Sequence, residues 1–206
     1  MKKLILLTTC LFLFLTGCNQ PAAEKKITEE YAQLKSGEVF YYGKKEDLKD
    51  YISHGTGILF LGFPECPWCQ VYLPMAEEVL EDQEMECMYY NIFTEKKNDR
   101  AYYDDIASLI ISQNDTGNDI VQYDSDGKQV IYMPLMLFIQ EGRIIAFDNE
   151  TCTEDSSVIS PEDYWTDEKT EALKERLAGY TSIIKEVKKE LDAKGCDTGC
   201  KVETNG

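Results

Sequence analysis

Histidine is almost absent from this sequence: His54 is the single one among 206 residues. Zinc and copper sites commonly use several imidazole ligands, and a Ser–His or Cys–His catalytic pair needs an imidazole beside its nucleophile. The scarcity of histidine therefore excludes most His-rich metal sites and disfavours enzymes built on such a pair.

Positive charge is also scarce. Lys and Arg together number 21 against 38 Asp and Glu, which gives a net charge of −17 at pH 7. Nucleic-acid phosphates and anionic lipid headgroups are both bound mainly through Lys and Arg. The balance argues against both as partners, and we interpret the acidity as a source of solubility. Global disorder is excluded as well, because 43% of the residues are hydrophobic and 11% aromatic.

Long apolar runs are missing except for one near the start of the chain. Leu4 to Leu15 is almost wholly apolar and follows two lysines. A basic start and an apolar run of this length are typical of a signal peptide, and the run is short for a membrane span. We therefore expect the start of the chain to be a targeting segment.

The end of this run, Leu15-Thr16-Gly17-Cys18, resembles the lipobox of bacterial lipoproteins. The resemblance implies a signal peptide over residues 1–17 and a lipid on Cys18. The polar composition of the stretch that follows predicts a tether over residues 18–35. It places the protein at the extracytoplasmic face of the cell membrane, held by its lipid anchor. The alternative is an ordinary signal peptide with an incidental cysteine.

An extracytoplasmic location permits disulfides to persist. Cys10 would leave with the signal peptide and Cys18 would be modified. The cysteines that remain are Cys66, Cys69, Cys87, Cys152, Cys196 and Cys200. An even number of cysteines is compatible with complete pairing but does not dictate it.

Hydrophobic periodicity predicts alternating strands and helices in the rest of the chain. Strands are expected over 38–42, 58–61, 86–93, 135–140 and 143–147, and helices over 44–53, 69–82, 101–112 and from 160 to 194. This order predicts an α/β fold with a central mixed β-sheet flanked by helices on both faces. We expect one such domain over residues 36–195, followed by a Cys-containing C-terminal tail over 196–206.

Cys66-Pro67-Trp68-Cys69 stands where a buried strand is expected to give way to a helix. Unpaired N–H groups and the helix dipole at a helix N-terminus favour a thiolate, so Cys66 should be the more acidic and more exposed thiol. Cys69 lies one turn further on and can displace a mixed disulfide. The spacing favours a redox-active pair. A static structural disulfide and half of a zinc site are the alternatives.

With this motif the chain resembles the thioredoxin superfamily. The C-x-x-C follows an apolar strand, Pro74 lies five residues after Cys69, and Met133-Pro134 opens a later hydrophobic strand. In that family a proline follows the motif within the same helix, and a cis-proline faces the two cysteines. The resemblance covers about residues 38–194 and implies a thioredoxin-like fold.

The resemblance also implies roles for individual residues. Cys66 would be the attacking thiol and Cys69 the resolving thiol, so that the two form a redox-active disulfide. Pro134 would be cis. The residues implied in substrate binding are Pro67, Trp68, Met133 and Pro134.

The chain departs from the family at one position. Thioredoxins bury an acid six residues before the first cysteine, where this chain has Phe60. Glu65 is a candidate substitute, and its alternative is a solvated acid at a loop edge. Tyr132-Met133-Pro134, in place of the usual Thr-Val-Pro, and the acidic surface disfavour a glutathione-binding relative.

These features together predict an extracytoplasmic, membrane-anchored thiol-disulfide oxidoreductase that acts on protein disulfides without a metal or organic cofactor. Its expected partners are exported proteins with thiols or disulfides and a redox donor in the membrane. The alternative is a non-catalytic thioredoxin-like adaptor, because the chain also loosely resembles accessory lipoproteins of bacteriocin export.

The other cysteines carry weaker predictions. Cys152 should lie near the substrate groove, because the chain returns to the active-site edge of the sheet after the strand over 143–147. Its alternative is exposure on the loop over 149–160. Cys196 and Cys200 should pair locally, or alternatively relay electrons to the C-x-x-C. Cys87 is interpreted as a buried free thiol.

Overall fold

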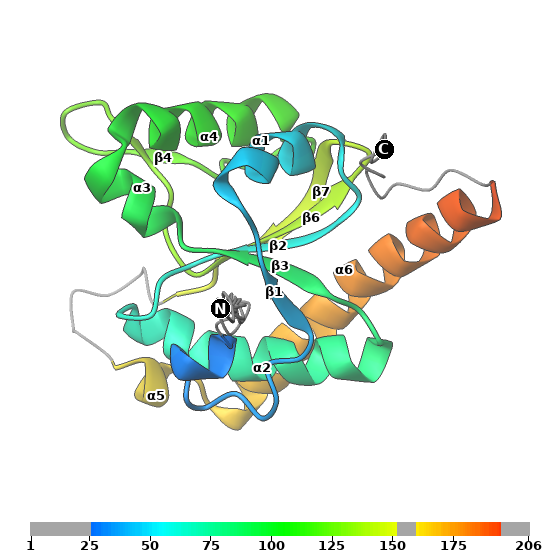
Figure 1. Ribbon diagram of the computed structural model, residues 1–206. Helices are drawn as coiled ribbons and strands as arrows, with labels where there is room; N and C mark the ends of the chain where they lie inside the picture. Colours follow the sequence, from blue (N-terminus) through cyan, green and yellow to red (C-terminus); the bar gives the residue numbers. More distant parts are fainter. Residues whose placement is uncertain (1–25, 152–159, 195–206) are drawn as a thin grey trace, which may run out of the picture.

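The computed structural model describes residues 26–151 and 160–194 and has a five-stranded mixed sheet at its centre (Figure 1). The strands are β1 (Phe40–Tyr42), β2 (Gly57–Leu61), β3 (Cys87–Tyr90), β6 (Leu135–Gln140) and β7 (Arg143–Asp148), in the spatial order β1-β3-β2-β6-β7. The first three in that order are parallel, whereas β6 is antiparallel to β2 and β7 to β6. The predicted mixed sheet is confirmed.

Helices cover both faces of the sheet, as predicted. On one face lie α1 (Lys45–His54), α3 (Ile92–Asn98) and α4 (Arg100–Gln113). On the other lie α2 (Pro67–Gln83), α5 (Pro161–Tyr164) and α6 (Asp167–Ala193). Figure 1 shows these two layers with the sheet edge-on between them.

Strand β2 is buried along its whole length because helices cover both of its faces. Successive side chains of a strand point to opposite faces. Accordingly Ile58 and Phe60 join the apolar cluster under α2 and α6, whereas Leu59 and Leu61 join the cluster under α1 and α4. The continuous apolar run in the sequence follows from this double burial.

Three elements differ from their predicted extents. The strand expected over 86–93 ends at Tyr90, because the Asn91 side chain accepts the N–H of Thr94 and starts α3. The expected loop after α4 contains a short hairpin of β4 (Gln122–Tyr123) and β5 (Gln129–Val130). The helix expected from residue 160 is divided into α5 and α6, and Thr166 caps the second.

The packed part of the chain begins earlier than residue 36. A 3-10 turn, η1 (Ile27–Glu29), lies within the stretch predicted as a polar tether. Ile27, Tyr31 and Leu34 are buried in the cluster under α2. Residues 26–35 therefore belong to the folded unit.

Several predicted features lie outside the described residues: the signal peptide, Cys18, Cys152 and the tail over 196–206. Within residues 26–151 and 160–194, none of the helices combines the length and the apolar character needed to cross a membrane.

Candidate active site

The sheet topology brings the C-x-x-C and Met133-Pro134 together. β2 ends at Leu61 and the antiparallel strand β6 begins at Leu135, and these two residues are paired in the register. The segment that follows β2 and the segment that precedes β6 therefore emerge at the same edge of the sheet. This edge carries the candidate site.

Cys66 occupies the N-cap of α2, with Pro67 as the first helical residue. Its Sγ accepts a hydrogen bond from the backbone N–H of Cys69 at 3.2 Å. Such a cap satisfies one of the N–H groups that a helix start leaves unpaired, and the bond favours negative charge on the sulfur. The predicted position of Cys66 at the helix start is confirmed.

The Met133-Pro134 peptide bond is cis, as predicted. Cys66 Sγ lies 3.7 Å from the carbonyl oxygen of Met133, to which the thiol donates. Pro134 is buried and the Met133 side chain is half-buried. The structure therefore joins the two sequence-predicted halves of the site at the Cys66 sulfur.

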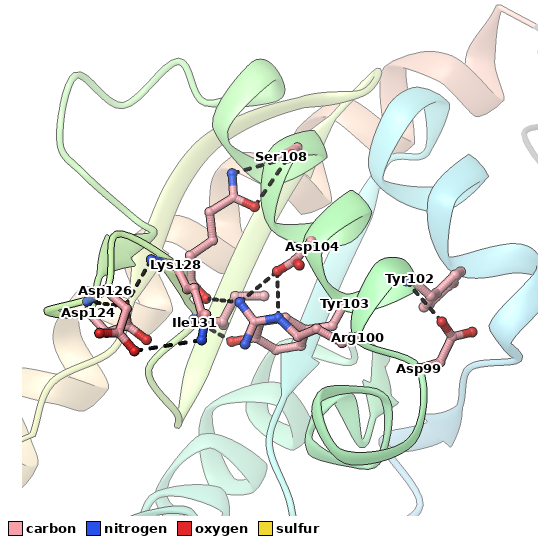
Figure 2. A network of polar contacts seen from close by, with 11 residues as sticks. Asp99, Arg100, Tyr102, Tyr103, Asp104, Ser108, Asp124, Asp126, Lys128 and Ile131 are labelled. Carbon is pink, nitrogen blue, oxygen red and sulfur yellow. Dashed lines mark hydrogen bonds and ion pairs between the residues drawn. The ribbon is translucent and has the colours of Figure 1, made fainter.

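Helix α4 anchors the segment that leads to Pro134, and Figure 2 shows this contact. The Ile131 N–H donates to the Tyr103 hydroxyl at 2.7 Å, and Arg100 Nη2 donates to the Gln129 carbonyl at 3.0 Å. In the turn before this segment the Asp124 carboxylate accepts the N–H groups of Asp126 and Lys128. These bonds fix the main chain just before Met133, and the sequence patterns did not predict the α4 contacts.

The two thiols differ in environment. Hydrogen bonding from the Cys69 thiol, supported by the N–H groups of Cys69 and Trp68, lowers the pKa of Cys66 against the opposing effect of burial. Burial raises the pKa of Cys69, and the neighbouring Cys66 raises it further. Cys66 is 4% exposed and Cys69 0%. Cys66 therefore has the properties of an attacking thiol, and Cys69 those of a thiol that reacts second.

We expect Cys66 to be alkylated first when the reduced protein is treated with iodoacetamide. Because its pKa lies below the ordinary cysteine value, its thiolate fraction and labelling rate should persist to lower pH than those of a free cysteine. Mass spectrometry of the peptide that contains both cysteines gives the order of labelling, and urea-unfolded protein serves as the control. Earlier labelling of Cys69 would reverse the assigned roles.

Trp68 packs against α5 through the last residue of that helix, Tyr164. Its ring meets that of Tyr164 edge-to-face, with centroids 5.4 Å apart, and the Tyr164 hydroxyl donates to Glu150 at 2.7 Å. Trp68 is half-buried and Pro67 is exposed. Both residues are therefore partly open to a molecule that approaches Cys66.

Helix α2 is also fixed by a buried acid that sequence reasoning missed. The Tyr72 hydroxyl donates to Asp148 Oδ1 at 3.1 Å, and Arg176 binds the other carboxylate oxygen and Glu150. Asp148 is buried at the end of β7. The one sequence feature that could have indicated Asp148 is an acid at the end of an apolar strand.

Phe60, which stands where thioredoxins carry an acid, is fully buried. Its ring stacks between those of Tyr72 and Tyr89, at centroid distances of 5.9 and 6.2 Å. Glu65, considered as a substitute for that acid, is exposed beside Cys66. The position six residues before Cys66 therefore carries an aromatic ring and no carboxylate.

The described residues contain no group of three or more His, Cys, Asp or Glu side chains suited to hold a metal ion. His54 lies at the last turn of α1, beside the start of β2 and so at the opposite edge of the sheet, where it pairs with Asp50. Cys87 begins β3 at that same opposite edge and is a buried free thiol, as predicted.

Comparison with protein-family models, with curated proteins and with solved structures finds no match to this chain. The fold and the site define a mixed α/β protein with two thiols at the start of a helix, beside a cis-proline.

Proposed function

We propose that the protein is an extracytoplasmic, membrane-anchored thiol-disulfide oxidoreductase of thioredoxin-like fold that acts on protein disulfides. One observation carries the proposal: Cys66 Sγ caps α2, accepts the N–H of Cys69 and lies 3.7 Å from the carbonyl oxygen that precedes cis-Pro134. The strand order β1-β3-β2-β6-β7, in which β6 alone runs antiparallel to the other four strands of this sheet, supports the thioredoxin-like arrangement.

The reaction proceeds in two exchanges. The Cys66 thiolate attacks one sulfur of a substrate disulfide, the substrate S–S bond breaks, and its other sulfur leaves as a thiolate. Cys69 then loses its proton and attacks the Cys66 sulfur, which releases the second substrate thiolate. The substrate gains two electrons and the protein ends with a Cys66–Cys69 disulfide. A redox donor in the membrane returns this disulfide to the dithiol.

Substrate would bind around Cys66 through main-chain and apolar contacts. The surroundings of the Cys66 sulfur are formed by exposed Pro67 and by the half-buried side chains of Trp68 and Met133. Pro134 has no N–H, and an extended substrate segment can pair with the neighbouring main chain. No metal or organic cofactor takes part in this chemistry.

Insulin reduction tests the proposal. With dithiothreitol as reductant, the full chain in detergent should accelerate precipitation of the insulin B chain above the rate with dithiothreitol alone. A non-catalytic adaptor would leave that rate unchanged, and this result would refute the proposed activity.

The lipid anchor is a separate prediction. Cys18→Ala should block processing or release the protein into the medium, because Cys18 would carry the only lipid. Cell fractionation and the apparent mass of the product measure this, with Cys10→Ala as the matched control that should remain anchored. A Cys18→Ala protein that stays membrane-bound at the mature size would contradict the anchor.

A further inference from the structure

Trp68 stands between the two cysteines in the first turn of α2 and is half-buried. Its side chain packs against the apolar cluster that contains Cys66 and Cys69. A half-exposed side chain samples several rotamers unless neighbouring groups hold it, and ordering such a side chain during binding costs affinity. The orientation of the Trp68 ring therefore depends on the groups that lie beside it.

Tyr164, the last residue of α5, lies beside this ring. The two rings meet edge-to-face with centroids 5.4 Å apart, which is a geometry that aromatic pairs favour. Helix α5 has only four residues, and so short a helix is not stable in isolation. Contacts with the rest of the fold must therefore place Tyr164 against Trp68.

Three further contacts hold Tyr164. Trp165 packs edge-to-face on its ring with centroids 5.1 Å apart, and Lys169 Nζ lies 3.5 Å from the ring centroid. The Tyr164 hydroxyl donates to Glu150 Oε1 at 2.7 Å. The residue is therefore fixed both through its aromatic ring and through its hydroxyl.

Glu150 in turn belongs to a set of polar contacts that leads back to α2. Its other carboxylate oxygen accepts a hydrogen bond from Arg176 of α6, and Arg176 Nε also donates to Asp148 at 3.1 Å. The Tyr72 hydroxyl donates to Asp148 at 3.1 Å, and Tyr72 lies one helical turn after Trp68 on α2. These contacts link α5, the end of β7 and α6 to one face of the active-site helix.

We propose that Tyr164 is a positioning residue for the reaction with protein disulfides: it fixes the orientation in which the Trp68 ring meets a substrate segment bound at Cys66. Glu150 holds the Tyr164 hydroxyl and so supports this orientation. Tyr164 acts on binding of the substrate chain and does not take part in the exchange of sulfur bonds. This inference rests on the proposed function and deepens it, because it assigns part of substrate recognition to an element outside the C-x-x-C helix.

Two disulfides of different size separate binding of a polypeptide from sulfur chemistry. The reduced full chain in detergent is mixed with an excess of insulin or of 2-hydroxyethyl disulfide, quenched with acid and mapped for the Cys66–Cys69 disulfide. Tyr164→Ala should lower the rate constant with insulin about threefold to tenfold, because the Trp68 ring must then be ordered during binding. The rate constant with the small disulfide, which brings no polypeptide to Trp68, should stay within about twofold of wild type.

A double variant shows whether Tyr164 acts through Trp68. In a Trp68→Ala background, Tyr164→Ala should cause no further loss in the rate constant with insulin, because the side chain that Tyr164 positions is absent. Additive losses would mean that Tyr164 contributes to the reaction independently of Trp68, and this result would overturn the positioning role.

Matched variants control for structural effects. Tyr180→Ala removes a half-buried ring that packs on Phe138, which pairs with Ile58 toward the opposite edge of the sheet. It should leave both rate constants within about twofold of wild type. Glu150→Ala leaves both aromatic rings in place, so it keeps the test valid if Tyr164→Ala destabilises α5. It should lower the rate constant with insulin selectively, whereas Glu162→Ala, which removes an exposed acid of α5, should not.

Tryptophan fluorescence reports the orientation of the ring independently of activity. The sequence has two tryptophans, so Trp165→Phe leaves Trp68 as the single emitter. Time-resolved anisotropy should show a rigid Trp68 while Tyr164 is present, and Tyr164→Ala should add a fast component from side-chain motion on the picosecond-to-nanosecond timescale.

The outcomes distinguish this inference from the proposed function. A wild-type chain that forms no Cys66–Cys69 disulfide with either substrate would refute the proposed function. A reactive wild type would refute only the positioning role if Tyr164→Ala left the rate with insulin unchanged, slowed both reactions equally or left the anisotropy of Trp68 unchanged.

Discussion

Cys66→Ser is expected to abolish disulfide exchange, with a loss of about a thousandfold or more in the rate of insulin reduction. The thiolate is the nucleophile in this chemistry, and a serine hydroxyl at the same N-cap can still accept the N–H of Cys69 but cannot attack a disulfide. The helix start should therefore remain intact while the activity is lost. Circular dichroism and thermal unfolding measure the first part, and the insulin assay the second.

Two further variants complete this prediction. Cys69→Ser should perform the first exchange and then accumulate the mixed disulfide on Cys66, because the resolving thiol is missing. Cys87→Ser, at the opposite edge of the sheet, is the matched control and should retain activity. Equal activity of Cys66→Ser and wild type would exclude Cys66 as the attacking thiol.

Glu77→Ala is expected to destabilise the fold strongly. The Glu77 carboxylate is 2% exposed and accepts the backbone N–H groups of Lys35, Ser36 and Gly37 at 2.7, 3.0 and 2.6 Å. Loss of the acceptor leaves donors without partners, at about 1–3 kcal/mol for each that remains buried. We expect the free energy of unfolding to fall by about 3 kcal/mol, which corresponds to a melting temperature lower by roughly 6–12 °C.

Glu78→Ala is the control, one residue further along the same helix. Glu78 is exposed and pairs with Lys174 at the surface, so its removal should cost about 1 kcal/mol or less. Because the Glu77 bonds hold the segment that follows Tyr31, the Glu77 variant should also loosen the contact of Tyr31 with Tyr89. Melting curves that coincide for the two variants would contradict the role given to Glu77.

The elements that the sequence predicted well depend on local signals. The buried run Ile58–Leu61, the C-x-x-C at a helix start and the Glu141-Gly142 turn are each encoded within a few residues, and each appears where expected. The cis bond before Pro134 was predicted from the resemblance to thioredoxins, because it accompanies the C-x-x-C in that family.

The features that the sequence did not predict depend on contacts between distant segments. Glu77 lies four residues after Leu73, on the apolar face of α2, and only the main chain that passes over it explains a buried acid there. Tyr31 lies in a stretch that is polar in composition, although Ile27 and Leu34 share its helical spacing. Local periodicity does not indicate which remote surface such residues meet.

The buried contact between Tyr31 and Tyr89 has the same origin. Tyr31 and Tyr89 are 58 positions apart in the sequence, and the sheet order places β3 between β1 and β2, so that Tyr89 reaches the active-site helix. The sequence offered Glu65 as a candidate substitute for the acid that thioredoxins bury, and this residue is exposed.

The exchange of electrons between Cys66, Cys69 and a protein disulfide is tested most directly by a stoichiometric reaction. The fully reduced chain is mixed with an equal amount of insulin without another reductant, quenched with acid at intervals and analysed by peptide mapping. The proposed function predicts that the peptide containing both cysteines loses two hydrogens and forms the Cys66–Cys69 disulfide, while two free insulin thiols appear for each disulfide formed. A Cys66–Cys69 pair that remains fully reduced while insulin stays intact would contradict it.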